Sequence, residues 1–289
     1  MSKLKLVIIF LVICTNFSAQ VKDSTKTRKA QITFAYPLGT NRKNAIEYTN
    51  KFSFNIIYGI NGGFNGVEIG SVLNYNKGES NGFQLGTVNV QQGNFKGFQM
   101  GVFNFTKKLN GIQFGVINIL GDADQGIPIG IINIVKGGLY EVEITGGEFI
   151  YGNVNYKMGV EKFYTIYKIG YATSNSNTIY TAGLGFGRNF RLSEKQKLSI
   201  DFSSSHISLN KSWKGSLNML NKVDFNYQHK LSEKLSFIIG PSFNIYLTEE
   251  KLDGEYGTFK IPYSMYTDEW SKGKLWMWIG GNVGLSLKL

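Results

Sequence analysis

The stretch from Gly66 to Asn133 contains five copies of one short sequence motif: GVEIGSVLN from Gly66, GFQLGTVN from Gly82, GFQMGVFN from Gly97, GIQFGVIN from Gly111 and GIPIGIIN from Gly126. Successive copies begin about 15 residues apart, which is too short for a pair of helices and suits one strand followed by a turn. Repetition of this kind builds a scaffold or a surface. It does not suit an active site, because chemistry needs different residues at different places.

Each copy changes phase at its second glycine. In the second copy, Phe83 and Leu85 lie on one face of an extended strand, whereas Val88, beyond Gly86, begins the other face. A glycine at such a switch indicates either a bulge within a strand or a corner between two strands. Bulges would make the copies successive strands of one barrel.

Corners would instead make the copies coils of a β-solenoid, in which the asparagine of each copy stacks on the next. These residues are Asn89, Asn104, Asn118 and Asn133. We favour the barrel, since strand-like segments continue after the repeats and no linker interrupts them. The solenoid stays as the structural alternative.

The C-terminal part of the chain, residues 181–289, alternates more cleanly. From Ser236 to Leu247, and again from Leu275 to Leu289, apolar residues occupy one face of the strand and polar or small residues the other. A period of two over about 10 residues is typical of a membrane barrel strand. A soluble β protein with an apolar core would show the same period, because the period does not say which face meets lipid.

Composition supports an all-β chain. The 289 residues include 35 glycines and only 4 prolines, and 14% of them are aromatic. Helical periodicity is almost absent. We therefore predict an all-β fold, an outer-membrane-type antiparallel β-barrel of about 14 to 16 strands. The alternative is a β-solenoid over the repeats, residues 60–137, joined to a smaller C-terminal barrel or sandwich.

Residues 1–20 have the layout of a secretory signal peptide. Lys3 and Lys5 precede a short apolar core, and a small and polar run follows it. The core is too short to span a bilayer as a helix. Cleavage after Ala19 or Gln20 would leave residues 21–289 as a single β domain. We expect it in the outer membrane of a Gram-negative bacterium, with the periplasm or secretion as the alternative.

Cys14 is the only cysteine of the chain. A cysteine near the end of a signal core is sometimes acylated, but Ile13 precedes it where a small residue is needed. We interpret Cys14 as one more apolar residue of the cleaved segment. The mature chain would then have no disulfide and no cysteine-based metal site.

The repeats also carry a family resemblance. Together with the block from Lys136 to Tyr171, TAGLGFGRNF from Thr181 and IGPSFNIYL from Ile239, the G-x-Q-x-G-x-x-N copies resemble exported surface repeat-containing proteins of Bacteroidetes-type bacteria. The resemblance implies an outer-membrane or surface β protein and supplies no catalytic residues. Pro128 departs from the Gln or Glu of the other copies. Because proline cannot donate to a ladder, we expect it at an edge, a bulge or a strand start.

The chain offers little chemistry. His206 and Ser208 lie two residues apart, as in the H-x-S-N element of barrel-borne lipid A deacylases, but Leu209 stands where that element has Asn. A polar strand end is the simpler interpretation. The segment from Glu249 to Lys274 reads as a long outward loop, and its acidic residues match no EF-hand spacing. We assign no catalytic, cofactor-binding or metal-binding residue.

The net charge of +11 does not indicate a nucleic-acid partner, since the basic residues are scattered and export is expected. Several lie near strand ends, where they would pair with anionic lipid or simply aid solubility. These are Arg42, Lys43, Lys107, Lys108, Lys195 and Lys197. We expect outer-membrane lipid and the barrel assembly machinery as partners.

Three functions follow from this architecture. The first is a non-enzymatic envelope or surface protein, structural or ligand-binding through its loops. The second is a pore for small solutes, favoured if Gln84, Gln99 and Gln113 face a lumen and opposed if Trp276 and Trp278 fill it. The third, an envelope lipid hydrolase using His206 and Ser208, is the one we favour least.

Overall fold

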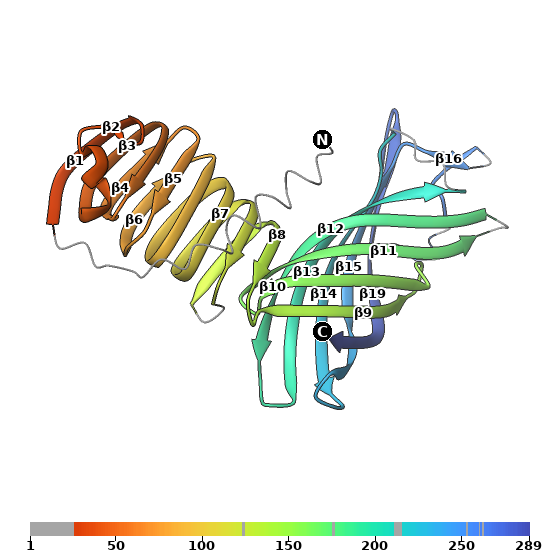
Figure 1. The fold of residues 1–289 in the computed structure, drawn as a ribbon. Helices are drawn as coiled ribbons and strands as arrows, with labels where there is room; N and C mark the ends of the chain where they lie inside the picture. The colour runs from red at the N-terminus through yellow and green to blue at the C-terminus, as the bar shows by residue number, and fades with distance from the viewer. Residues whose placement is uncertain are drawn as a thin grey trace.

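The computed structural model describes residues 26–122, 125–174, 177–210, 216–252, 254–259, 261 and 263–289. The predicted signal peptide at 1–20, with Cys14, lies outside these residues. The described chain forms two regions, a parallel β-solenoid followed by an antiparallel barrel (Figure 1). Within the described residues, no helix is long and apolar enough to cross a membrane.

The solenoid comprises residues 26–135. Its elements are β1 (Lys26–Ala35), β2 (Leu38–Gly39), a 3₁₀ helix (Arg42–Glu47), β3 (Tyr48–Asn61), β4 (Gly63–Gly70), β5 (Leu73–Asn76), β6 (Ser80–Leu85), β7 (Val88–Leu120) and β8 (Gly126–Val135). Strands of neighbouring coils pair in parallel and in repeat register, so that Gly82 lies beside Gly97 and Asn118 beside Asn133. The phase switches are therefore corners, and each copy is one coil.

The two glycine positions of each copy require glycine for different reasons. In the first four copies the first glycine has a positive φ, +139° at Gly97, and a Cβ there would lie 1.9 Å from the carbonyl oxygen of Gly82 in the preceding coil. The second glycine lies at a crowded corner: a Cβ on Gly101 would lie 2.3 Å from the carbonyl oxygen of Gly86 in the preceding coil and 2.6 Å from the Nδ2 of Asn89. The corner therefore requires glycine because the backbone of the preceding corner and the stacked asparagines both approach closely.

The solenoid interior is polar. Asn89 donates to Asn104 at 2.9 Å, Asn104 to Asn118 at 2.9 Å and Asn118 to Asn133 at 2.9 Å, and all four are buried. A second ladder joins Gln113, Gln99 and Gln84, at 2.7 Å and 2.5 Å. The predicted asparagine ladder is present. Pro128 continues the glutamine column in β8, which pairs only with β7, and so occupies the expected sheet edge.

The barrel comprises residues 139–288. Its strands are β9 (Leu139–Gly147), β10 (Gly152–Val160), β11 (Phe163–Ser174), β12 (Asn177–Arg191), β13 (Gln196–Leu209), β14 (Asn218–Lys230), β15 (Leu235–Thr248) and β19 (Gly273–Lys288). Neighbouring strands are antiparallel, and β19 closes the ring by pairing with both β15 and β9. The loop between β15 and β19 carries β16 (Lys251–Leu252), β17 (Glu255–Tyr256) and β18 (Tyr266–Trp270).

The all-β fold and the antiparallel barrel are confirmed. The closed barrel has eight strands, fewer than the expected 14 to 16, because the repeats pair in parallel with one another and do not enter it. The alternative, a solenoid over residues 60–137 joined to a smaller C-terminal barrel, also fits this structure. Even, clean alternation at 181–289 belongs to barrel strands, and the glycine corners at 66–134 belong to the solenoid.

The last solenoid coil packs against the barrel wall and forms hydrogen bonds with it. β8 packs on β10 and β11. The Asn133 amide donates to the Thr165 hydroxyl at 2.9 Å, and that hydroxyl donates to the Gly130 carbonyl at 2.6 Å. The Tyr167 hydroxyl donates to the Ile131 carbonyl at 2.7 Å. The asparagine ladder therefore ends on a barrel strand.

Candidate membrane interface

The barrel has its polarity inverted relative to a soluble β protein. Large apolar side chains point outward and stay exposed on every side of the ring, including Ile144, Ile169, Phe186, Ile200, Phe225, Ile239 and Val283. The alternate positions point inward; most are polar or charged, and apolar and aromatic residues such as Ile207 and Trp278 gather toward one end. This alternation suits an outer surface in contact with lipid. The β15 and β19 alternation predicted from the sequence has its apolar face on this outer side.

An ionic layer crosses the barrel interior near the middle of its strands. A cavity of about 570 Å³, lined by Glu141, Lys197 and Gln228, lies between this layer and the β10–β11 and β12–β13 turns. The Lys157 ammonium, 1% exposed, lies 2.6 Å from the Glu143 carboxylate and 2.7 Å from that of Asp201. The Tyr164 hydroxyl also donates to Asp201, and the Asn226 amide does so at 3.3 Å. Pairing and hydrogen bonding of this kind are what a buried charge requires.

A third carboxylate, that of Asp224, extends the layer around the ring. Asp224 lies 3.3 Å from the Lys222 ammonium and 3.8 Å from that of Lys168, and it accepts a hydrogen bond from Asn282 at 3.2 Å. The cavity left between these side chains is about 10 Å³, room for about one water molecule. The layer therefore closes the barrel lumen.

An aromatic cluster seals the other end. Trp278 and Tyr246 are fully buried, and Phe259 from the β15–β19 loop stacks on Tyr246 with ring centroids 4.8 Å apart. The β9–β10 turn folds inward as well, where the Glu148 carboxylate accepts a hydrogen bond from the Trp278 indole at 2.8 Å. Trp276 packs against the same cluster. Part of the segment predicted as a long outward loop, at Phe259, therefore folds back into the barrel mouth.

The other predicted residues fall in separate places. Gln84, Gln99 and Gln113 face the packed solenoid interior, with no exposed surface, and not the barrel lumen. Ser208 is fully buried, and its hydroxyl has no hydrogen-bond partner within the part of the chain that the structure describes. No base is therefore placed on that hydroxyl, and the geometry lends the hydrolase hypothesis no support.

The sequence did not single out the ionic layer. Its members are dispersed through the chain, and only their inward parity could have drawn attention to them: Asn153, Asn155 and Lys157 alternate with outward residues along β10. Across the described residues, no group of three or more His, Cys, Asp and Glu side chains is arranged to hold a metal ion.

Glu68 holds a special position in the solenoid. It starts the glutamine ladder and is fully buried, and its carboxylate accepts hydrogen bonds from the amides of Asn55, Asn61, Asn76 and Gln84. Burial raises the pKa of the Glu68 carboxyl, and these amide donors act in the opposite direction.

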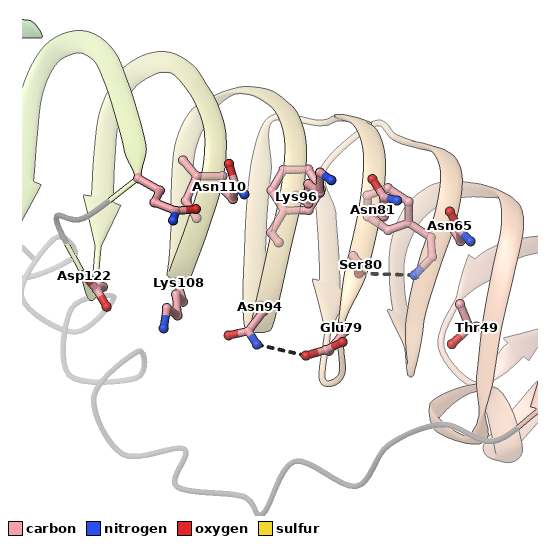
Figure 2. A pocket seen from close by; sticks show the side chains of 14 residues that line it. Thr49, Asn65, Glu79, Ser80, Asn81, Asn94, Lys96, Lys108, Asn110 and Asp122 are labelled. Carbon is pink, nitrogen blue, oxygen red and sulfur yellow. Dashed lines mark hydrogen bonds between the residues drawn. The ribbon is translucent and has the colours of Figure 1, made fainter. Parts of the chain in front are cut away.

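The edge of the solenoid where one coil leads into the next, at residues 79–81, 94–96 and 108–110, is polar and hollowed. Figure 2 shows the side chains that line this edge in a row along the coils. The hollow between them has a volume of about 690 Å³. Lys96 and Lys108 lie on it, along with the acidic Glu79 and Asp122. The side chains of Phe64 and Phe95 lie beneath and belong to a small apolar cluster. This edge contrasts with the two other outer faces of the coil, which are apolar.

Comparisons with protein-family models, with curated proteins and with solved structures found no match for this chain.

Proposed function

We propose that this chain is an outer-membrane protein in which a closed, non-enzymatic eight-stranded barrel anchors a β-solenoid to the membrane. The observation that carries the proposal is the inverted barrel. Charged Lys157, Glu143 and Asp201 are buried inside it, while Phe186 and Phe225 are exposed outside it. In water this arrangement would expose a large apolar surface and bury charge, whereas in a bilayer it satisfies both.

The connections at the two ends agree with this placement. The turns between β10 and β11, β12 and β13, and β14 and β15 are short, and the solenoid joins the barrel at that end. At the other end, the β9–β10 turn is also short, but the loops between β13 and β14 and between β15 and β19 are longer. Outer-membrane barrels have short periplasmic turns and longer external loops. We infer that the solenoid end faces the periplasm.

A sealed lumen favours an anchor over the alternative of a small-solute pore. The ionic layer and the cluster around Trp278 close the lumen at two levels. Small eight-stranded barrels have an interior that side chains alone are able to fill. Ligand binding would therefore take place at the outer surfaces and loops of the protein.

The test is fractionation of cells that express the full chain, followed by gel electrophoresis of boiled and unboiled membrane pellets. We expect the protein in the outer-membrane fraction, with an unboiled band that migrates differently because the closed barrel resists detergent. Recovery in the soluble fraction with no mobility change would overturn the proposal. Steady conductance of the purified protein in planar bilayers would overturn the sealed anchor and favour the pore.

A further inference from the structure

We infer that the solenoid lies within one leaflet of the membrane around the barrel, with its two apolar faces among lipid acyl chains. The inference rests on the proposed membrane location of the barrel. It adds that the solenoid, which does not span the membrane, also contacts lipid. Lipid acyl chains are the occupants of both faces.

The first apolar face is built from the strand before each corner. Its outward side chains stack from coil to coil through the parallel register, for example Phe54, Ile69, Leu85 and Met100. Phe114 and Ile129 continue this column in the last two coils. The column contains no polar residue over its whole length.

The second apolar face is built from the strand after each corner. Tyr58, Leu73 and Val88 stack in its first coils, and Ile117 and Ile132 in its last ones. Between the faces, the corner carries Val102, Val116 and Ile131, which are 41–47% exposed. A solenoid surrounded by water places such residues inside and polar ones outside. Here the coils bury their Asn and Gln ladders instead.

The apolar corner is continuous with the outer wall of the barrel. A groove of about 820 Å³ lies between the two regions. Met100, Phe114 and Ile131 line it from the solenoid, and Leu184, Phe186 and Phe202 line it from β12 and β13. These barrel residues belong to the proposed lipid-facing surface, so acyl chains next to the barrel would also contact the solenoid corner.

Dimensions and polarity fit one leaflet. Each apolar face holds about five residues, a width of about 16 Å, which is close to half of a hydrocarbon core of about 30 Å. The polar edge with Lys96, Lys108, Glu79 and Asp122 would then lie at the level of the headgroups (Figure 2). A second copy packed on one face would leave the other exposed, whereas a leaflet covers both faces and the corner together.

Fluorescence quenching by lipid tests this inference on the full chain. We would replace Cys14 by Ser, so that each variant has a single cysteine, and attach an environment-sensitive fluorophore at Phe114→Cys, Phe225→Cys or Asn94→Cys. Phe114 and Phe225 are both 47% exposed, one on the solenoid and one on the barrel. Asn94 lies on the polar edge. The probes are phosphatidylcholine–phosphatidylglycerol vesicles with a spin-labelled acyl chain.

We expect the fractional quenching at Phe114→Cys to match that at Phe225→Cys within a factor of about two, with little at Asn94→Cys. Quenching at Phe225→Cys alone would overturn the leaflet placement and leave the barrel anchor standing. Quenching at neither position would overturn both. Protection of Phe114→Cys from lipid, with disulfide cross-linking between copies when the cysteine is left unlabelled, would overturn the inference in favour of a second copy.

Discussion

The solenoid and the barrel both bury polar side chains and expose apolar ones, but they satisfy their interiors differently. The barrel uses opposite charges, as in Lys157 between Glu143 and Asp201. The solenoid uses neutral amides, as in the Asn89, Asn104, Asn118 and Asn133 ladder. The difference follows from what each residue has as its neighbour across the sheet.

In a solenoid, equivalent residues of successive coils lie side by side, so a charged residue in each copy would face its own charge. An amide avoids this conflict, because it donates to one neighbour and accepts from the other. In the barrel, neighbouring strands have unrelated sequences, and opposite charges are able to meet. Glu68, an acceptor without a donor, is found where the glutamine ladder starts and not within it.

Replacing Lys157 by Met should have the largest effect. It leaves Glu143 and Asp201 buried without their shared cation, and breaking a buried pair in this way costs about 3 to 5 kcal/mol. The measurement is the urea midpoint of the folded, unboiled gel band of the protein in vesicles. Lys162→Met, in the exposed β10–β11 turn, is the matched control and should move the midpoint little. Equal midpoints for the two variants would contradict the charge-paired interior.

Replacing Asn104 by Leu should break the neutral ladder in its middle. The Asn89 amide loses an acceptor and the oxygens of Asn118 and Phe114 lose a donor, a cost of about 2 to 5 kcal/mol. We expect the solenoid to lose stability and therefore to be cleaved earlier by protease. The barrel should still give its heat-modifiable band on a gel.

The control for this ladder variant is Asn110→Leu, on the exposed polar edge. It adds the same side chain without removing a buried hydrogen bond, so proteolysis should resemble that of the unmodified protein. Equal sensitivity of both variants would show that the ladder does not stabilise the coils.

The repeats show how far the sequence alone leads. Their spacing, glycines and asparagines predict either bulged barrel strands or solenoid coils, and both need glycine at Gly86. The choice depends on whether Gly82 lies beside Gly97 in a parallel pair, as the structure has it. That pairing joins residues of two coils and is not visible within one copy.

The barrel interior shows a different limit. Alternation along β15 and β19 is local, so the sequence predicts it. The contact of Lys157 with Asp201 joins residues 44 positions apart, on strands separated by β11 and β12. No period or spacing marks such a pair, because the two side chains meet only across the closed lumen. The seal made by Trp278 and Phe259 depends on closure in the same way.

Replacing Glu68 by Gln should have a smaller effect than either interior break. The new amide group would face donors that now point at a carboxylate oxygen, among them Asn76 and Gln84. The Asn76 side-chain oxygen has no partner among the described residues, so a flip of that amide would restore one hydrogen bond. We expect a loss of about 1 to 2 kcal/mol, measured as the thermal midpoint of the solenoid. A gain in stability would contradict the account of Glu68 as the ladder's acceptor.

Replacing Thr165 by Val should have the smallest effect on stability and the clearest effect on coupling between the two regions. The Thr165 hydroxyl is the point where the asparagine ladder ends on β11, and it also donates to Gly130. The Asn133 amide keeps its hydrogen bond to the Gly130 carbonyl at 3.0 Å, so the loss of stability should be about 1 kcal/mol.

Hydrogen exchange would locate this loss of stability in the chain. We expect faster exchange in β8 and the coil before it, with β13 to β15 unchanged. Thr173→Val, on the exposed part of β11, should change neither region. If exchange in β8 stays at the unmodified rate, the junction does not depend on this ladder contact, and the packing of β8 on β10 and β11 suffices to join the regions.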